Sequence, residues 1–213
     1  MKEITSREKI LKNIRNASIN KYENPWTSLD MESPVFKEFG DSPDIMFAQE
    51  FIRLGGRFIY CENEKEISDN LAVMIMENKW KELCCLDPAI QRFLATESIP
   101  FSDESENLEN CPVGITKCEC LIARTGSIVV SSRHASGRKL NILPEVHIVL
   151  ATISQVVNNL KEALELLKRR YGSALPSHIS MIAGPSRTAD IEKTLVMGAH
   201  GPRELYVLLT EEK

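Results

Sequence analysis

The sequence predicts an α/β fold with a mixed sheet, preceded by an N-terminal helical extension. From about residue 45 onward, strand-like apolar segments alternate with segments of helical periodicity, which is typical of a sheet covered by helices on both faces. Two strand-like runs flank the short turn at 124–127, which indicates either a hairpin or a strand with a tight bend, and the hairpin would make the sheet mixed. The 213 residues, 43% hydrophobic and 26% charged, are enough for one globular domain with an appendage.

Residues 1–44 are expected to form a helix followed by an extended linker. Thr5 and Glu8 have the spacing of a capping box, and Ile10, Leu11 and Ile14 follow at helical intervals. The segment 24–44 contains three prolines and shows no hydrophobic period, which predicts an extended connection. We therefore expect two parts, the N-terminal helix and linker over 1–44 and an α/β domain over 45–213.

Helix-capping residues mark the elements of the α/β domain. Gly55 suits the end of one helix, Asn63 with Glu66 opens another, and Ser154 is expected to cap a long helix that ends at Gly172. The predicted helices cover 48–54, a segment from 63 onward, 89–95, a segment from 154 to 171, and 187–196. The predicted strands cover 57–61, 82–86, 121–123, 128–130, 146–151, 179–183 and 205–209.

Composition and charge exclude several classes of protein. The net charge is −4, with 26 basic and 30 acidic residues, so the chain lacks the basic excess of nucleic-acid-binding proteins. No apolar run approaches the ~20 residues needed to cross a bilayer, and the charged N-terminus has no secretory apolar segment. We expect a cytoplasmic protein with no membrane span and no nucleic acid among its partners.

The cysteine pattern does not predict a metal centre. Six cysteines lie at positions 61, 84, 85, 111, 118 and 120, with no C-x-x-C pair, and the four histidines form no H-x-H or H-x-x-x-H pattern. Zinc and iron–sulfur sites favour thiolates two to four residues apart. We expect no metal and no cofactor in this chain. The cysteines should be buried thiols rather than disulfides, because the cytosol keeps thiols reduced.

Three polar loops are candidates for a ligand site. The segment Gly184–Glu192 (GPSRTADIE) joins a predicted strand to a predicted helix, and Gly198–Pro202 (GAHGP) leads into the last strand. Ligands of open α/β sheets bind beyond the carboxyl ends of the strands. The cationic loop Ser131–Lys139 would either close over an anionic ligand or stay solvated. The expected ligand contacts in the two glycine-containing loops are Gly184, Pro185, Ser186, Arg187, Thr188 and Gly201.

The chemistry of these loops suggests an anion site. Ser186 would cap the predicted helix and leave the backbone N–H groups of Arg187 and Thr188 available to an anion. Arg187 opposes the helix dipole at this position, so it would either hold a bound carboxylate or phosphate or pair with Asp190. His200 and Asp190 are the candidate catalytic acid–base residues, although a loop histidine can equally serve as a hydrogen-bond donor.

The two glycine-containing loops closely resemble the C-terminal motif of the LUD-domain family of lactate-utilisation proteins. The likeness covers roughly residues 45–210 and includes the Thr125-Gly126-Ser127 turn and the segment Leu143–Ile148. We therefore count Thr125, Gly126 and Ser127 among the expected ligand contacts. The resemblance implies a three-layer α/β/α sandwich with a mixed sheet, similar to the sugar-phosphate isomerase and CoA-transferase-like fold.

The resemblance also implies a function. It implies a subunit that supports oxidation of L-lactate to pyruvate together with iron–sulfur partner subunits, and that itself binds a small anionic metabolite. The alternative is a stand-alone enzyme, similar to isomerases or transferases, that acts on a phosphorylated or carboxylated metabolite. Arg124 stands where the family usually has an acidic residue before the Thr-Gly turn. Because arginine is no carboxylate nucleophile, covalent CoA-transferase chemistry is not expected at this turn.

Overall fold

The computed structural model describes residues 5–19, 36, 39–106, 108–191, 194–198 and 200–211, and of 188–191 and 194–197 it describes the backbone only. The chain divides into two compact units, Met1–Glu38 and Phe39–Lys213. The predicted linker falls largely on 20–35 and 37–38, outside the described residues. The predicted boundary between residues 44 and 45 stays a prediction.

The first unit contains the helix α1 (Ser6–Ile19). Its capping box is confirmed, because the Thr5 N–H donates to Glu8 Oε2 at 3.0 Å and the Glu8 N–H donates to Thr5 Oγ1 at 3.4 Å. No side chain of α1 is buried. Among the described helices, none combines the length and the apolar character needed to cross a membrane.

In the described part of the second unit, the larger sheet has six strands in the order β1-β12-β7-β4-β2-β3. Every neighbouring pair in it is parallel. In that spatial order, the strands are β1 (Arg57–Cys61), β12 (Glu204–Thr210), β7 (Val146–Thr152), β4 (Val113–Lys117), β2 (Leu83–Cys84) and β3 (Phe101–Ser102).

A smaller, four-stranded sheet contains both strand directions, in the order β8-β5-β6-β9. The predicted hairpin is the antiparallel pair of β5 and β6, while β8 lies parallel to β5 and β9 antiparallel to β6. The strands are β8 (Val156–Val157), β5 (Cys120–Ile122), β6 (Ser127–Ser131) and β9 (Ile179–Ile182). The α/β fold with mixed strand directions is confirmed.

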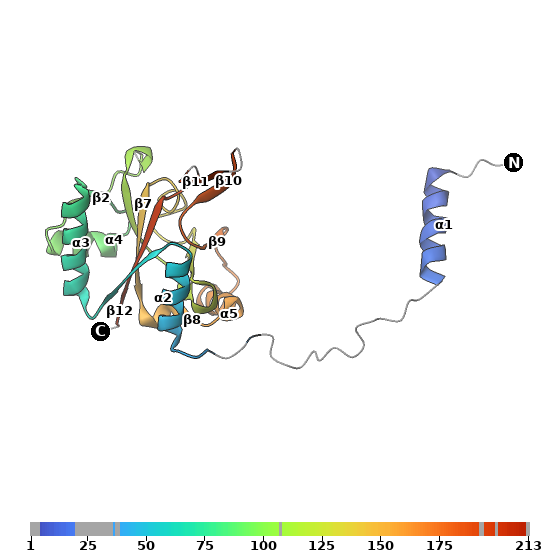
Figure 1. The fold of residues 1–213 in the computed structure, drawn as a ribbon, viewed down its shortest axis with the longest axis horizontal. Coiled ribbons are helices and arrows are strands. Elements are labelled where there is room, and N and C mark those ends of the chain that lie inside the picture. Colours follow the sequence, from blue (N-terminus) through green and yellow to red (C-terminus); the bar gives the residue numbers. More distant parts are fainter. Residues whose placement is uncertain are drawn as a thin grey trace. The chain divides into compact units, whose positions relative to one another are not determined.

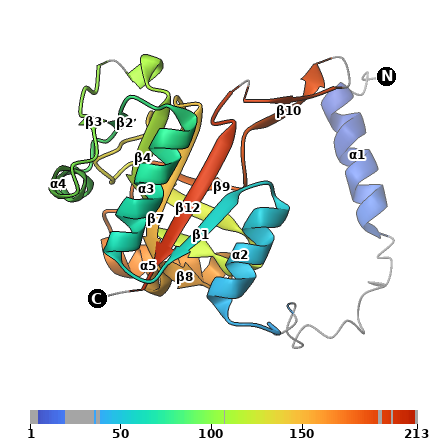
Figure 2. The same cartoon turned by 60° about the vertical axis from the view of Figure 1, so that its left-hand side comes forward.

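Helices enclose both sheets, as Figures 1 and 2 show. One face of the larger sheet packs against α3 (Glu64–Asn78) and α4 (Pro88–Thr96). The other face packs against α2 (Pro43–Arg53) and the smaller sheet. The smaller sheet packs in turn against α5 (Leu160–Tyr171). The two helical layers of the predicted sandwich therefore enclose two sheets rather than one.

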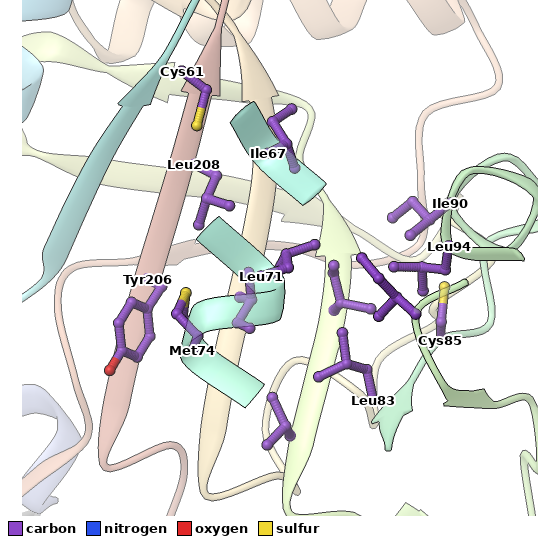
Figure 3. Close-up of a cluster of buried hydrophobic side chains, with 14 residues drawn as sticks. Cys61, Ile67, Leu71, Met74, Leu83, Cys85, Ile90, Leu94, Tyr206 and Leu208 are labelled. Atoms are coloured by element: carbon purple, nitrogen blue, oxygen red, sulfur yellow. The ribbon is translucent and has the colours of Figure 1, made fainter. Parts of the chain in front are cut away.

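The largest core cluster lies between the larger sheet and the helices α3 and α4 (Figure 3). Leu71 and Met74 of α3 and Ile90 and Leu94 of α4 pack there with Leu208 of β12. Full burial of such a side chain stabilises the fold by about 1.5–3 kcal/mol. Side chains of β12 alternate between this cluster and the cluster beneath α2, as the two-residue period of a strand requires.

The helix predicted over 187–196 is wrong. The structure has an antiparallel hairpin there, made of β10 (Arg187–Ile191) and β11 (Thr194–Met197), at the end of β12 opposite the C-terminus in Figure 1. Ser186 does not cap a helix. Its N–H donates to the Pro202 carbonyl at 2.8 Å, and its carbonyl accepts from the Gly198 N–H at 3.0 Å. These two bonds close the base of the hairpin.

The long helix starts later than predicted. Its N-cap is Asn159, whose side chain accepts from the Glu162 N–H at 3.2 Å, and not Ser154. Val156 and Val157 pair with β5 before the helix begins. The predicted end at Gly172 is confirmed, because this residue has a φ of +55° and its N–H donates to the Lys168 carbonyl.

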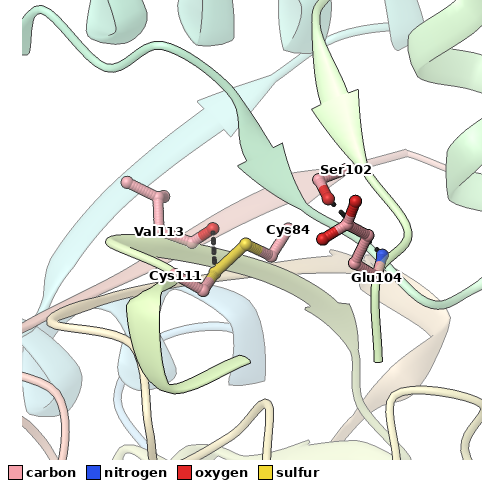
Figure 4. The surroundings of a disulfide bond; sticks show 5 residues. All are labelled: Cys84, Ser102, Glu104, Cys111 and Val113. Atoms are coloured by element: carbon pink, nitrogen blue, oxygen red, sulfur yellow. Dashed lines mark hydrogen bonds between the residues drawn. A yellow bond between two sulfur atoms is a disulfide. The ribbon is translucent and has the colours of Figure 1, made fainter. Parts of the chain in front are cut away.

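A disulfide joins Cys84 of β2 to Cys111, which corrects the expectation of reduced cysteines (Figure 4). The two α-carbons lie 6.1 Å apart, and the bridge is buried with Leu108 and Leu140. The other cysteines are buried thiols, as predicted, and their pKa values are raised by burial. They are Cys61, Cys85, Cys118 and Cys120.

Candidate functional site

The three polar loops meet at a cavity of about 270 Å³, which we call the motif cavity. Its lining comes from the segments 130–142, 178–186 and 200–202. Arg138, of the loop predicted to be either solvated or closed over a ligand, is one of the lining residues. The three loops singled out in the sequence therefore line one cavity, which they approach from both sheets.

The position of the cavity differs from the one expected. The loop at Gly184 leaves the carboxyl end of β9, but β9 belongs to the smaller sheet. In the larger sheet the cavity lies at the amino ends of the strands, since Pro202 lies shortly before β12 and Ile142 shortly before β7. The rule for carboxyl ends of parallel strands thus does not apply to this site.

Gly184, Ser186, His200 and Gly201 are the predicted site residues that the structure brings together in the lining. Gly184 has a φ of +86°, and a Cβ there would lie 2.8 Å from the Leu54 carbonyl oxygen. A Cβ on Gly201 would lie 3.2 Å from the Ser186 Cβ. Gly201 thus lets the two loops approach each other closely, and Gly184 lets its loop pack against Leu54 at the end of α2.

Arg187 does not hold the position predicted for it. Its side chain is exposed and is not among the lining residues, and its Nη2 donates to the Leu54 carbonyl oxygen. Arg187 starts a strand and not a helix. The backbone N–H groups of Arg187 and Thr188 therefore do not belong to a helix N-terminus, contrary to expectation. Pro185 is buried outside the lining. The side chains of Thr188 and Asp190 lie outside the described residues, so the catalytic assignment of Asp190 stays a prediction.

The Thr125-Gly126-Ser127 turn lies beneath α2. Gly126 has a φ of +56°, and a Cβ there would lie 2.5 Å from the backbone nitrogen of Phe51. Ser127 is buried, and its Oγ donates to the Thr125 carbonyl at 3.3 Å. None of the three is a lining residue of the motif cavity, and their role as ligand contacts stays a prediction.

Asn141 is a lining residue that the sequence did not reveal. It is 7% exposed, and its Nδ2 donates to the Gly137 carbonyl at 3.1 Å. Its Oδ1 is buried and has no hydrogen-bond partner within the described part of the chain. An unsatisfied buried acceptor costs about 1–3 kcal/mol, so a ligand that donates a hydrogen bond would relieve this cost.

Cationic and hydrogen-bonding side chains dominate the polar lining. Arg138 Nη2 donates to Ser177 Oγ at 2.8 Å, a bond that uses one of the five N–H donors of a guanidinium. His178 Nε2 and Ser180 Oγ lie 2.7 Å apart. No Asp or Glu occurs among the described lining residues. His178 and Ser180 could not be recognised from the sequence, since a polar residue at or near the end of a strand is usually solvated.

A buried carboxylate fixes the loop that carries Arg138. Glu119 Oε1 accepts from Ser131 Oγ at 2.5 Å and from the Tyr171 hydroxyl at 2.6 Å, and Arg170 Nη1 donates to Oε2. His134 Nε2 lies 3.3 Å from Oε1. Burial by itself would raise the pKa of Glu119, but the nearby His134 imidazole and the hydrogen bonds from Ser131 and Tyr171 outweigh burial and lower the pKa to about 2.

The polar lining of the motif cavity contains one arginine and two histidines. Its lining loop is anchored on the Glu119 network, and its polar groups converge on one cavity. His200 is exposed and also lines an adjoining hollow with Arg203 and Glu145. Among the residues with described side chains, no three or more His, Cys, Asp or Glu gather where they could hold a metal ion.

Comparison with known proteins identifies the family. The model of the LUD domain matches residues 46–210. The chain belongs to the LUD domain family. A solved structure of similar fold, described as a DUF162 family protein from Deinococcus radiodurans, has a TM-score of 0.59 at 19% sequence identity. The similarity covers 79% of this chain and 96% of that one, and it supports the α/β fold.

Curated relatives match this LUD chain over about half of their length. An uncharacterised protein of Neisseria meningitidis is 37% identical over 117 residues, which are 53% of this chain and 50% of that protein. Lactate utilization protein C of Geobacillus thermodenitrificans is 37% identical over 106 residues, 48% of this chain and 44% of the relative. The protein of the same name from Bacillus subtilis is 36% identical with the same coverage.

Proposed function

We propose that this LUD protein is a subunit that supports oxidation of L-lactate to pyruvate and binds a small carboxylate in the motif cavity. The observation that carries the proposal is the lining of that cavity, where Arg138 faces no described acid and the Oδ1 of Asn141 lacks a partner. A 2-hydroxy acid offers a carboxylate to the arginine and a hydroxyl donor to the amide oxygen. The relatives named lactate utilization protein C support the same class of substrate.

Electron transfer would reside in partner subunits that carry iron–sulfur clusters, with no cofactor in this chain. The state of its cysteines supports this division. Cys84 and Cys111 are joined to each other, and burial raises the pKa of the four thiols, although cluster ligands must be thiolates. The purified chain should therefore be colourless and should not reduce an electron-accepting dye with L-lactate. Dye reduction by the chain alone would contradict the proposal.

Ligand binding is tested by titrating L-lactate and pyruvate into the full chain with calorimetry. Arg138→Gln removes a charge-assisted contact worth about 1.5–3 kcal/mol, so the dissociation constant should rise by about 10- to 100-fold. Arg169→Gln, at an exposed end of α5, is the control and should bind as the unaltered chain does. Equal affinity of the two variants would remove Arg138 from the site.

The alternative is a stand-alone enzyme that acts on a phosphorylated or carboxylated metabolite. It is favoured by the position of His200, which lines both the motif cavity and the adjoining hollow beside Arg203. In that case His200 would transfer a proton, with Asp190 as the second candidate. The isolated chain would then turn over such a compound, and His200→Gln would lower kcat by about 10²-fold or more. A His200→Gln variant with unchanged turnover would exclude this role.

A further inference from the structure

A second cavity, of about 260 Å³, opens at the opposite edge of the larger sheet. We call it the carboxyl-edge cavity because Lys117, Thr152 and Thr210, the last residues of β4, β7 and β12, all line it. The carboxyl edge of a parallel sheet is where α/β folds bind ligands. None of its lining residues belongs to the motif cavity.

The walls of this cavity are apolar and come from two helices and one strand. Ile67 of α3 faces it from one helix, and Ile90 and Phe93 of α4 from the other. Leu150 and Ala151 of β7 complete the apolar lining. Binding of an apolar group in such a slot is favourable, by roughly 25 cal/mol for each Å² of apolar surface removed from water.

One end of the slot is polar, and its hydrogen-bonding capacity is not used up. Thr210 is 9% exposed, and its Oγ1 is buried without a partner within the described part of the chain. Lys117 Nζ lies 3.5 Å from Asp87 Oδ1, a long contact. The same Asp87 oxygen accepts the N–H groups of Ala89 and Ile90 at 2.8 and 3.1 Å, because it caps α4. Lys117 thus shares this carboxylate oxygen with two backbone N–H groups that lie closer to it.

The charge at the rim restricts the ligand further. Glu64, at the start of α3, also lines the cavity, so the ligand meets one ammonium group and one carboxylate. A second negative charge on the ligand would approach the Glu64 carboxylate, and two like charges repel each other. Phosphates and dicarboxylates are therefore disfavoured in comparison with a single carboxylate.

We propose that the carboxyl-edge cavity binds a monocarboxylate with an apolar, ring-sized body. Its carboxylate accepts hydrogen bonds from Lys117 Nζ and Thr210 Oγ1, and its ring lies between Ile90 and Phe93. This site is separate from the motif cavity and does not depend on the function proposed for it.

The proposal is tested on the full chain with 3-phenylpropionate as the probe, by saturation-transfer NMR and calorimetry. Two matched compounds separate the contributions of the ligand: 3-phenylpropionamide lacks the charge and propionate lacks the ring. Each should bind at least tenfold more weakly than the probe. Equal binding of the amide would overturn the role of Lys117, and equal binding of propionate would overturn the apolar slot.

Variants locate the site. Lys117→Met and Thr210→Val should each weaken the probe about tenfold, whereas Lys81→Met, at an exposed lysine outside the cavity, should have no effect. Ala89→Leu fills the cavity from its half-exposed rim and should abolish binding while the circular dichroism spectrum is kept. The Ala89→Leu variant still tests the location of the site if a variant at Lys117 or Thr210 fails to fold. Unchanged binding to folded Ala89→Leu would place the probe elsewhere and overturn the proposal.

Discussion

Glu119 connects three parts of the domain through one carboxylate. Ser131 ends a strand of the smaller sheet, His134 belongs to the loop of the motif cavity, and Arg170 and Tyr171 end α5. A buried charge is tolerated only when such partners compensate its desolvation. The residue therefore acts on the site indirectly, since it positions the loop that carries Arg138.

Glu119→Gln should lower the free energy of unfolding at pH 7 by about 2–4 kcal/mol, because Arg170 loses its carboxylate and Tyr171 loses a charged acceptor. Chemical denaturation with urea measures this change. Glu165→Gln, on the exposed face of α5, is the control and should change stability by less than about 0.5 kcal/mol. Comparable losses in the two variants would show that the Glu119 network is not stabilising.

The pH dependence gives an independent check of the same network. The pKa of Glu119 is lowered from 4.5 to about 2 in the folded protein, so the folded state binds this proton less readily than the unfolded chain. Its contribution to stability is present above pH 4.5 and is lost as the pH falls toward 2, at up to about 1.4 kcal/mol per pH unit. The Gln variant should lack this part of the slope, and identical acid profiles would contradict the assignment.

Among the elements, the turn at Gly126 is tightly enclosed by the backbone of α2. Gly126→Ala should destabilise the protein by about 2–4 kcal/mol, since it adds a left-handed strain of about 1–2 kcal/mol to a clash with the backbone of α2. Gly137→Ala is the matched control, with a φ of +62° and no atom within 4 Å of the added Cβ. It should show the strain alone. Equal losses in the two variants would mean that the contact with α2 is not limiting.

Helix and strand assignments from sequence succeeded where periodicity and caps agreed. Asn63, for example, caps α3 as predicted, and its side chain accepts from the Glu66 N–H at 3.0 Å. They failed where β-branched residues occur in a pattern that also suits a helix. Thr188, Ile191, Thr194 and Val196 favour strands for steric reasons, and tertiary pairing turned 187–197 into a hairpin. The same holds for Val156 and Val157, which pair with β5.

The candidate site was predictable only in part. The loops at 184–186 and 200–201 could be selected from the sequence because their glycines indicate tight turns. In the structure both loops line the motif cavity. Asn141 and His178 could not be predicted as lining residues. The sequence does not show that Asn141 is buried or that the loops carrying the two residues meet. Arg187 was misplaced because its expected role depended on a helix N-terminus that does not form.

Across the whole molecule, the Cys84–Cys111 bridge ties β2 to the segment before β4, 27 residues further along the chain. In the loop-entropy account, closing a loop of this length stabilises the fold by about 3–4 kcal/mol. Reduction with dithiothreitol should lower the free energy of unfolding by that amount, as measured in urea. Cys84→Ala/Cys111→Ala should reproduce the loss and no longer respond to reductant. A variant that still responded would implicate another pair.

The position of β12 has a consequence for how the protein is made. This strand, Glu204–Thr210, lies between β1 and β7, and its contact between Arg57 and Tyr206 spans 149 residues. While the ribosome is still synthesising the chain, β1 therefore has no neighbour in its sheet, and an unpaired strand edge favours association with other chains. The pairing of β1 within the larger sheet must therefore wait until β12 has been translated, and until then the edge of β1 is open to other chains.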